Sequence, residues 1–285
     1  ELRAKVVGEG GNLGMTQLGR VEFGLHGGAS NTDFIDNAGG VDCSDHEVNI
    51  KILLGEIVAA GDMTGKQRNK LLVEMTDAVG GLVLGNNYKQ TQALSLAERR
   101  ARERVGEYKR LMTALEGAGK LDRALEFLPS DDELNERANN GQGLTRAELS
   151  VLISYSKIDL KESLLKSQVP DDEYLAREME TAFPPLLAQK FGEPMRRHRL
   201  KREIVSTQIA NDLVNHMGIT FVQRLKESTG MSAANVAGAY VIVRDVFRLP
   251  HWWQQIEALD HQVPADLQLQ LMDELMRLGR RATRW

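Results

Sequence analysis

The position of the β-prone residues is the feature that most limits what this chain can fold into. Residues 4–7 and 31–35 are typical of short strands, and a glycine-dense loop at 8–14 and a helical pattern at 16–25 separate them. This order predicts a βαβ unit, in which the two strands are parallel. From Asp45 onward no stretch convincingly predicts a strand.

Two short parallel strands do not form a stable sheet by themselves, and parallel sheets are normally covered by helices on both faces. Either further strands lie upstream, or the downstream helices cover the pair. The predicted fold is therefore mainly α: a two-strand parallel remnant of a doubly wound, Rossmann-type α/β domain, followed by a multi-helix C-terminal region. We place the distal part of the first domain at residues 1–90 and an all-helical region at residues 91–285.

Apolar residues at helical spacing, together with capping residues, divide the rest of the chain into helices. A Thr-x-x-Glu capping box at Thr145 and a possible cap at Thr64 mark two of the starts, and further helices begin at Ser130 and Asp171. Besides the two helices that begin at Ser130 and Asp171, the predicted helices cover residues 47–57, 64–83, 95–115, 121–128, 145–169, 199–217, 219–227, 232–249 and 265–284.

Composition excludes several classes of protein. The 285 residues are 42% hydrophobic with a net charge of −4, so neither nucleic acid nor an anionic membrane is an expected partner. No apolar run reaches the ~20 residues of a membrane-spanning helix, and no signal peptide precedes the first strand. The single cysteine, Cys43, excludes a disulfide framework within the chain. We expect a cytoplasmic protein and, because the sequence begins with Glu1, a piece of a longer one.

The stretch 37–44, Asn-Ala-Gly-Gly-Val-Asp-Cys-Ser, follows the second predicted strand and precedes a helix. Adjacent glycines at such a junction allow a ligand to approach the backbone, and Asn37 and Ser44 supply polar side chains. The loop 8–14 carries Asn12 at the same predicted sheet edge, so the two loops are expected to converge on one ligand. The alternative is a turn whose glycines serve geometry only.

Other candidate sites are weaker. The cluster Asp42, Asp45, His46 and Glu47 has no recognised metal-ligand spacing, so no metal is expected, and Asp45 and Glu47 are predicted to cap a helix. Cys43 is expected to be buried as a small hydrophobic residue. The loop 8–14 does not match the G-x-G-x-x-G dinucleotide fingerprint.

Two of these segments resemble glutamate dehydrogenases. Residues 7–12, Val-Gly-Glu-Gly-Gly-Asn, resemble the E-G-A-N segment of that family, and residues 36–47 resemble its N-A-G-G-V-x-x-S-x-x-E segment in register. Residues 31–54, 144–149 and 198–204 are similar to the large bacterial NAD-specific enzymes. In those enzymes a central catalytic region is followed by a helical C-terminal region.

The resemblance implies roles for four residues. Asn12 would face the nicotinamide ribose and Asn37 the nicotinamide, both as NAD-binding residues. Ser44 would hydrogen-bond the side-chain carboxylate of glutamate, and Val41 would line the same pocket. Departures from the family pattern, such as Gly11 in place of alanine, leave the detailed cofactor contacts open.

The resemblance also implies oxidative deamination of L-glutamate to 2-oxoglutarate by a homo-oligomer that uses NAD. Neither the family's catalytic Lys and Asp nor a cofactor fingerprint has a match, so no catalytic residue is assigned in this chain. We expect those parts upstream and an inactive fragment. The alternative function is a helical oligomerisation or regulatory module without its own catalysis.

Overall fold

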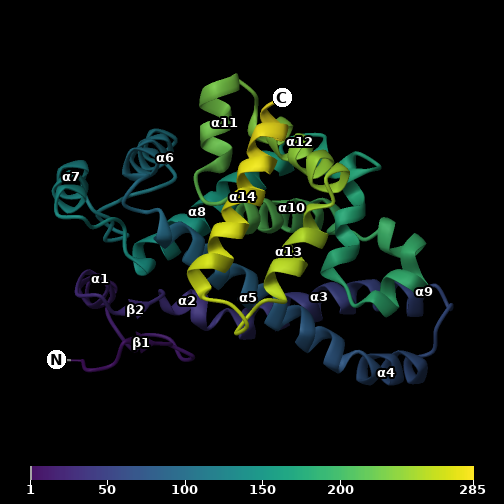
Figure 1. Ribbon diagram of the computed structural model, residues 1–285. Helices are drawn as coiled ribbons and strands as arrows, with labels where there is room; N and C mark the ends of the chain where they lie inside the picture. Colours follow the sequence, from purple (N-terminus) through teal and green to yellow (C-terminus); the bar gives the residue numbers. More distant parts are fainter. Residues whose placement is uncertain (1) are drawn as a thin grey trace.

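Helices make up almost all regular structure in residues 2–285, the part of the chain that the computed structural model describes (Figure 1). This confirms the predicted fold class. The α-helices are α1 (Gln17–Leu25), α2 (Asp33–Asp36), α3 (Ala38–Ala59), α4 (Gly65–Glu74), α5 (Thr76–Arg99), α6 (Val105–Gly117), α7 (Asp131–Asn139), α8 (Arg146–Leu165), α9 (Pro185–Arg196), α10 (Lys201–Met217), α11 (Phe221–Thr229), α12 (Ala233–Val246), α13 (Leu249–Glu257) and α14 (Ala265–Arg284). Two 3₁₀ helices, η1 (Val169–Asp171) and η2 (Leu175–Ala182), connect α8 to α9.

The two strands are parallel, as predicted. β1 (Val6–Val7) pairs with β2 (Ala29–Ser30) in the register Val6 to Ala29 and Val7 to Ser30. Val6 is 71% exposed, so the described helices leave part of this pair uncovered. On the other side, Ser30 is buried and β2 packs against α8.

The second strand was predicted in the wrong place. Residues 33–36 form α2, and the strand lies just before them. Tertiary contacts decide this: the Thr32 hydroxyl donates to the Ala147 carbonyl at 3.0 Å, and the Asp33 carboxylate accepts the Leu13 N–H at 2.9 Å. These contacts hold the β-prone residues in a short helical turn.

The predicted loop at 37–44 is also wrong, because these residues form the first turns of α3. The buried face of α3 keeps helical spacing through His46, Asn49, Ile50, Leu53, Leu54 and Ile57. Asp45 and Glu47 consequently lie inside the helix and do not cap it, and Glu47 pairs with Lys51. Cys43 is exposed on α3, so its predicted burial is wrong as well.

Three further boundaries differ from the predictions. The helix predicted over 64–83 is divided at Met75 into α4 and α5, and the one predicted over 95–115 is divided between Arg99 and Val105. Residues 121–128 form turns, with Phe127 at φ 54°. Helix α9 was missed because proline was taken as a stop, whereas Pro185 occupies the first turn, where proline fits.

Three of the predicted helix starts have the expected caps. Thr64, Ser130 and Thr145 each accept the backbone N–H of the residue three positions later, and each of these forms a reciprocal capping box. The predicted limits of α14 also match. Of the four leucines at helical spacing on α14, Leu275 packs against an apolar cluster, whereas Leu267, Leu271 and Leu278 are between 38% and 45% exposed.

The core is organised around α8 and α10, which cross at the centre of the molecule and pack closely (Figure 1). One continuous apolar cluster extends from Ile35 to Val241 through these helices. Helix α5 runs unbroken across the predicted domain boundary at residue 90. The division into two domains therefore stays a prediction.

Candidate functional site

Buried and half-buried carboxylates fix the loop that carries Asn12. Glu9 is 7% exposed, pairs with Arg20 at 2.5 Å and accepts the Met15 N–H at 2.8 Å. The N–H of Glu9 itself donates to Asp36 at 3.0 Å. Glu9 thereby holds the loop against α1, and Asp36 holds it against α2.

Asp33 holds the same loop at its far end. The Leu13 N–H donates to the carboxylate of Asp33 and, together with the nearby Arg20, lowers the pKa of that carboxyl despite its partial desolvation. Leu13 adopts φ 64° here, a region that non-glycine residues rarely occupy. The position of the loop is therefore defined by charge-assisted hydrogen bonds rather than by apolar packing.

Asn37 joins the two predicted segments. It lies between α2 and α3, and its side chain makes no helix-capping hydrogen bond. Instead its Nδ2 donates to Oδ1 of Asn12 at 2.9 Å. The side chains of these two asparagines, 25 positions apart, therefore meet, and their convergence on one ligand stays a prediction.

A cavity of about 560 Å³ opens beside this pair. Asn12, Asn37 and Val41 all line it, and Val41 is 75% exposed. Ser44 is exposed on α3 but is not among the lining residues. The geometry thus brings together three of the four predicted residues and leaves the fourth further along the same helix.

The two glycines of residues 37–44 do not form a turn. Gly39 and Gly40 have helical backbone angles, and neither has a positive φ. A Cβ on Gly39 would lie 3.5 Å from Val83, and one on Gly40 would meet nothing within 4 Å. Glycine destabilises a helix relative to alanine, and neither position has a backbone conformation that requires glycine. Backbone geometry therefore does not explain why glycine occupies these two positions.

The other walls of the cavity come from helices that sequence reasoning did not connect with it. The contributing residues lie on α5, α8 and α10: Val83, Asn86, Asn87, Gln90, Lys157, Lys161, Thr207, Asn211 and Asn215. Only one signal in the sequence marks them. Thr207, Asn211 and Asn215 recur every fourth position on a helix whose apolar stripe is buried at Val205, Ile209, Leu213 and Met217.

Lys157 has the most perturbed environment in the cavity. Its Nζ donates to Oε1 of Gln90 at 2.6 Å. Desolvation by burial lowers the pKa of Lys157 to about 7, although the charge of Asp42 opposes this shift. At neutral pH this amine therefore exchanges between its charged and neutral forms.

The acidic cluster on α3 has a structural explanation. His46 is 4% exposed and its Nδ1 lies 2.9 Å from the Ala182 carbonyl, which ties α3 to η2. Asp42 accepts a hydrogen bond from Asn86 at 2.9 Å. Within residues 2–285, no group of three or more His, Cys, Asp or Glu side chains could hold a metal ion.

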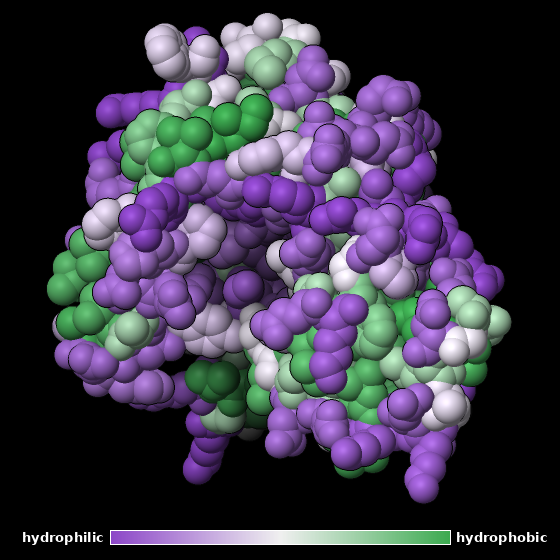
Figure 2. All heavy atoms as spheres, turned by 90° about the vertical axis from the view of Figure 1, so that its right-hand side faces the viewer, coloured by the Kyte–Doolittle hydropathy of each residue, from purple (hydrophilic) through white to green (hydrophobic). Residues whose placement is uncertain are grey.

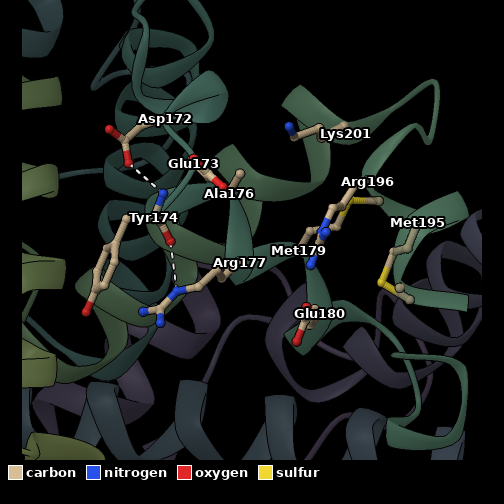
Figure 3. A pocket seen from close by; sticks show the side chains of 11 residues that line it. Asp172, Glu173, Tyr174, Ala176, Arg177, Met179, Glu180, Met195, Arg196 and Lys201 are labelled. Carbon is tan, nitrogen blue, oxygen red and sulfur yellow. Dashed lines mark hydrogen bonds between the residues drawn. The ribbon is translucent and has the colours of Figure 1, made fainter. Parts of the chain in front are cut away.

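A larger cavity of about 690 Å³ lies between η2 and α9 (Figure 3). On the face of the molecule that carries α9, Figure 2 shows a central hollow lined by hydrophilic residues. Tyr174 and Arg177 both bind Asp245, at 2.7 and 3.0 Å, and Arg196 pairs with Glu193. None of the predicted site residues lines this cavity, and these charged groups already have partners, so we place the candidate site at the smaller cavity.

Two arginines near the start of α10 also form ion pairs. Arg199 lies 3.4 Å from Glu56, and Arg202 pairs with Asp171. Of the helices in residues 2–285, none combines the length and the apolar character needed to cross a membrane.

Two family profiles match the chain. Residues 1–97 match the family profile described as bacterial NAD-glutamate dehydrogenase, catalytic domain, and residues 141–285 match the profile described as glutamate dehydrogenase, C-terminal. The lining residues of α3 and α5 fall within the first match, and those of α8 and α10 within the second.

Three relatives match over all 285 residues of the chain. They are the NAD-specific glutamate dehydrogenases of Pseudomonas aeruginosa at 87% identity, Halomonas elongata at 59% and Mycobacterium tuberculosis at 41%. The chain spans 18%, 18% and 17% of the lengths of these proteins. The chain therefore belongs to the bacterial NAD-specific glutamate dehydrogenase family.

Proposed function

We propose that this chain supplies part of the nicotinamide and substrate pocket of a longer, cytoplasmic, NAD-dependent glutamate dehydrogenase. The enzyme would convert L-glutamate to 2-oxoglutarate and ammonia. The observation that carries the proposal is that Asn12, Asn37 and Val41 line one cavity, in which the two asparagines are hydrogen-bonded to each other.

The residues of the cavity suit the nicotinamide end of NAD. Asn12 and Asn37 present amide groups that can pair with a carboxamide or a ribose hydroxyl. The exposed Val41 offers an apolar surface beside them. NAD, when bound, accepts the hydride from glutamate Cα, and the role of these side chains is to orient the two reactants.

Ser44 would bind the side-chain carboxylate of glutamate. It lies one turn of α3 beyond Val41, on the exposed surface of the helix, where a preceding part of a longer chain would meet it. The phosphate-binding loop and the catalytic Lys and Asp would come from that preceding part, since this sequence contains no match to them.

A comparison of two chains tests this function. Residues 1–285 and a chain extended upstream through a dinucleotide fingerprint are titrated with NAD by fluorescence and assayed with glutamate. We expect binding and turnover only in the extended chain. No NAD binding by either chain refutes the pocket assignment, and turnover by residues 1–285 alone refutes the predicted inactivity of the fragment.

Assembly into a homo-oligomer is a second candidate function, and α14 favours it. Leu267, Leu271 and Leu278 are exposed on this helix although their spacing is typical of a packed face. Replacing the three leucines with lysine is expected to lower the mass of the homo-oligomer measured by light scattering, without changing the helical content of the protein. An unchanged mass would exclude α14 as the assembly surface.

A further inference from the structure

The inner wall of the candidate pocket comes from the C-terminal helical region, whose role in this pocket is unassigned. Lys157 and Lys161 project from α8, and Thr207, Asn211 and Asn215 project from α10. These residues lie within the C-terminal family match and outside the catalytic-domain match. The pocket is therefore incomplete without the helices that follow residue 141.

Lys157 lacks a carboxylate partner. Among residues 2–285 it forms no ion pair, and its hydrogen bond goes to the neutral amide of Gln90. Burying an ammonium group without a directly bonded carboxylate is costly, and the pKa of Lys157 is lowered although the charge of Asp42 offsets part of that cost. A negatively charged group entering the cavity would remove this cost.

Asn215 is a second unsatisfied group on the same wall. Its side chain belongs to a residue only 7% exposed, and its Oδ1 has no hydrogen-bond partner in the described part of the chain. Asn87 Oδ1, across the cavity on α5, is unsatisfied in the same way. Buried acceptors without partners are costly, so each of these two oxygens can receive a donor from a ligand.

Acidic and basic side chains lie on different walls of the cavity. The α3 wall carries Asp42 and Asp45, and the α8 wall carries Lys157 and Lys161, while α5 and α10 contribute uncharged amides and a hydroxyl. A ligand with an ammonium group and carboxylates is complementary to this arrangement. L-Glutamate has both, and NAD has no carboxylate.

We propose that Lys157 is a substrate-binding residue, contributed by the C-terminal helices, whose ammonium group binds a carboxylate of glutamate or 2-oxoglutarate. The inference rests on the proposed function, because it takes the cavity to be the substrate pocket. Lys161, one turn further along α8, adds a second positive charge to the same wall. The free amide oxygens of Asn87 and Asn215 are available to the ammonium group of glutamate.

The test uses the full-length enzyme and glutarate, a dicarboxylate that cannot react. Glutarate binding is measured by calorimetry in the presence of NAD, alongside the KM for glutamate and the Kd for NAD. The variants are Lys157→Met and Lys157→Arg. The matched control is Lys166→Met, an exposed lysine at the end of the same helix that does not line the cavity.

Loss of one charge-assisted hydrogen bond predicts that Lys157→Met weakens glutarate binding and raises the KM for glutamate by about 10- to 100-fold. The Kd for NAD should stay within about twofold, and Lys166→Met should leave all three constants unchanged. Equal glutarate affinity in the Lys157→Met and Lys166→Met enzymes overturns the proposal. So does an effect on NAD alone, which would make this wall part of the cofactor site.

The pH profile gives a readout that a structural role would not produce. Both carboxyl groups of glutarate are ionised between about pH 7 and 9, so its affinity for the wild-type enzyme should fall over this range as Lys157 loses its proton. Lys157→Arg keeps its charge throughout and should remove this dependence. A dependence that persists in Lys157→Arg refutes the proposal even if Lys157→Met does not fold. A wild-type enzyme that binds neither glutarate nor NAD refutes the proposed function itself.

Discussion

Replacing Arg244 with methionine tests how the wall of the pocket is held in place. Arg244 is buried on α12, and its guanidinium reaches Glu178 at 2.5 Å and Asp212 at 2.9 Å. Asp212 lies on α10 between the cavity residues Asn211 and Asn215. One cation thus links η2, α10 and α12 directly behind the candidate site.

The expected loss of stability follows from burial. The side chains of Arg244 and Glu178 are only 10% and 8% exposed, so the substitution leaves a buried carboxylate without its partner. Removal of one member of a buried ion pair costs about 3–5 kcal/mol. Methionine keeps most of the apolar volume of the arginine stem, so little of this loss comes from packing.

The assay is urea unfolding of residues 1–285 at pH 7, followed by circular dichroism. Arg177→Met is the matched control: it removes a guanidinium that binds Asp245, a residue that Arg244 also contacts, but Arg177 is 52% exposed. An exposed pair contributes about 0–1 kcal/mol. If both variants lose the same free energy of unfolding, the reasoning from burial is refuted.

Three further predictions concern acid stability and the ligand site. Burial alone would raise the pKa of Asp212, but His216 and Arg244 hold it below its ordinary value, so its contribution to stability is present above about pH 4 and is lost at lower pH. Urea unfolding of Asp212→Asn should show a weaker acid dependence than wild type, and an identical one would contradict this assignment. Gly39→Ala should stabilise α3 by up to about 1 kcal/mol yet weaken ligand binding by the full-length enzyme, because Gly39 lines the cavity. Gly40→Ala, which has open space around it and is outside the lining, should stabilise without changing affinity, and equal affinities in the two variants would exclude a ligand at Gly39. Ser44→Ala in the full-length enzyme should raise the KM for glutamate, and an unchanged KM argues against Ser44 as a substrate residue.

Local interactions were predictable from the sequence because they depend on residues three or four positions apart. The capping boxes at Thr64, Ser130 and Thr145 each involve side chains and N–H groups within one turn, and each marks the start of a helix. The glycine-dense loop and the helix after it were enough to predict parallel strands. The meeting of Asn12 with Asn37 followed from that topology, since both segments lie at one edge of the strand pair.

Tertiary structure decided the features for which local and long-range preferences compete. Residues 33–36 are β-prone, but hydrogen bonds to the loop at Leu13 and to α8 hold them in a helical turn. The segment 37–44 contains two glycines, yet it forms the first turns of α3, although the buried face of this helix begins only at His46. Leu267, Leu271 and Leu278 have core spacing, but the described residues leave them exposed.

The candidate pocket divides in the same way. Asn12, Asn37 and Val41 lie in two short segments whose residue pattern identified them. Lys157 and Asn215 are more than 100 positions away in sequence, on helices whose patterns are typical of a packed bundle. The sequence by itself determined the starts of several helices and the parallel direction of the strands, because these depend on neighbouring residues, and it indicated Asn12, Asn37 and Val41 as candidate site residues. Only the packing of α8 and α10 against α5, which itself packs against α3, brought Lys157 and Asn215 to the same cavity, because no local interaction specifies which helix faces meet.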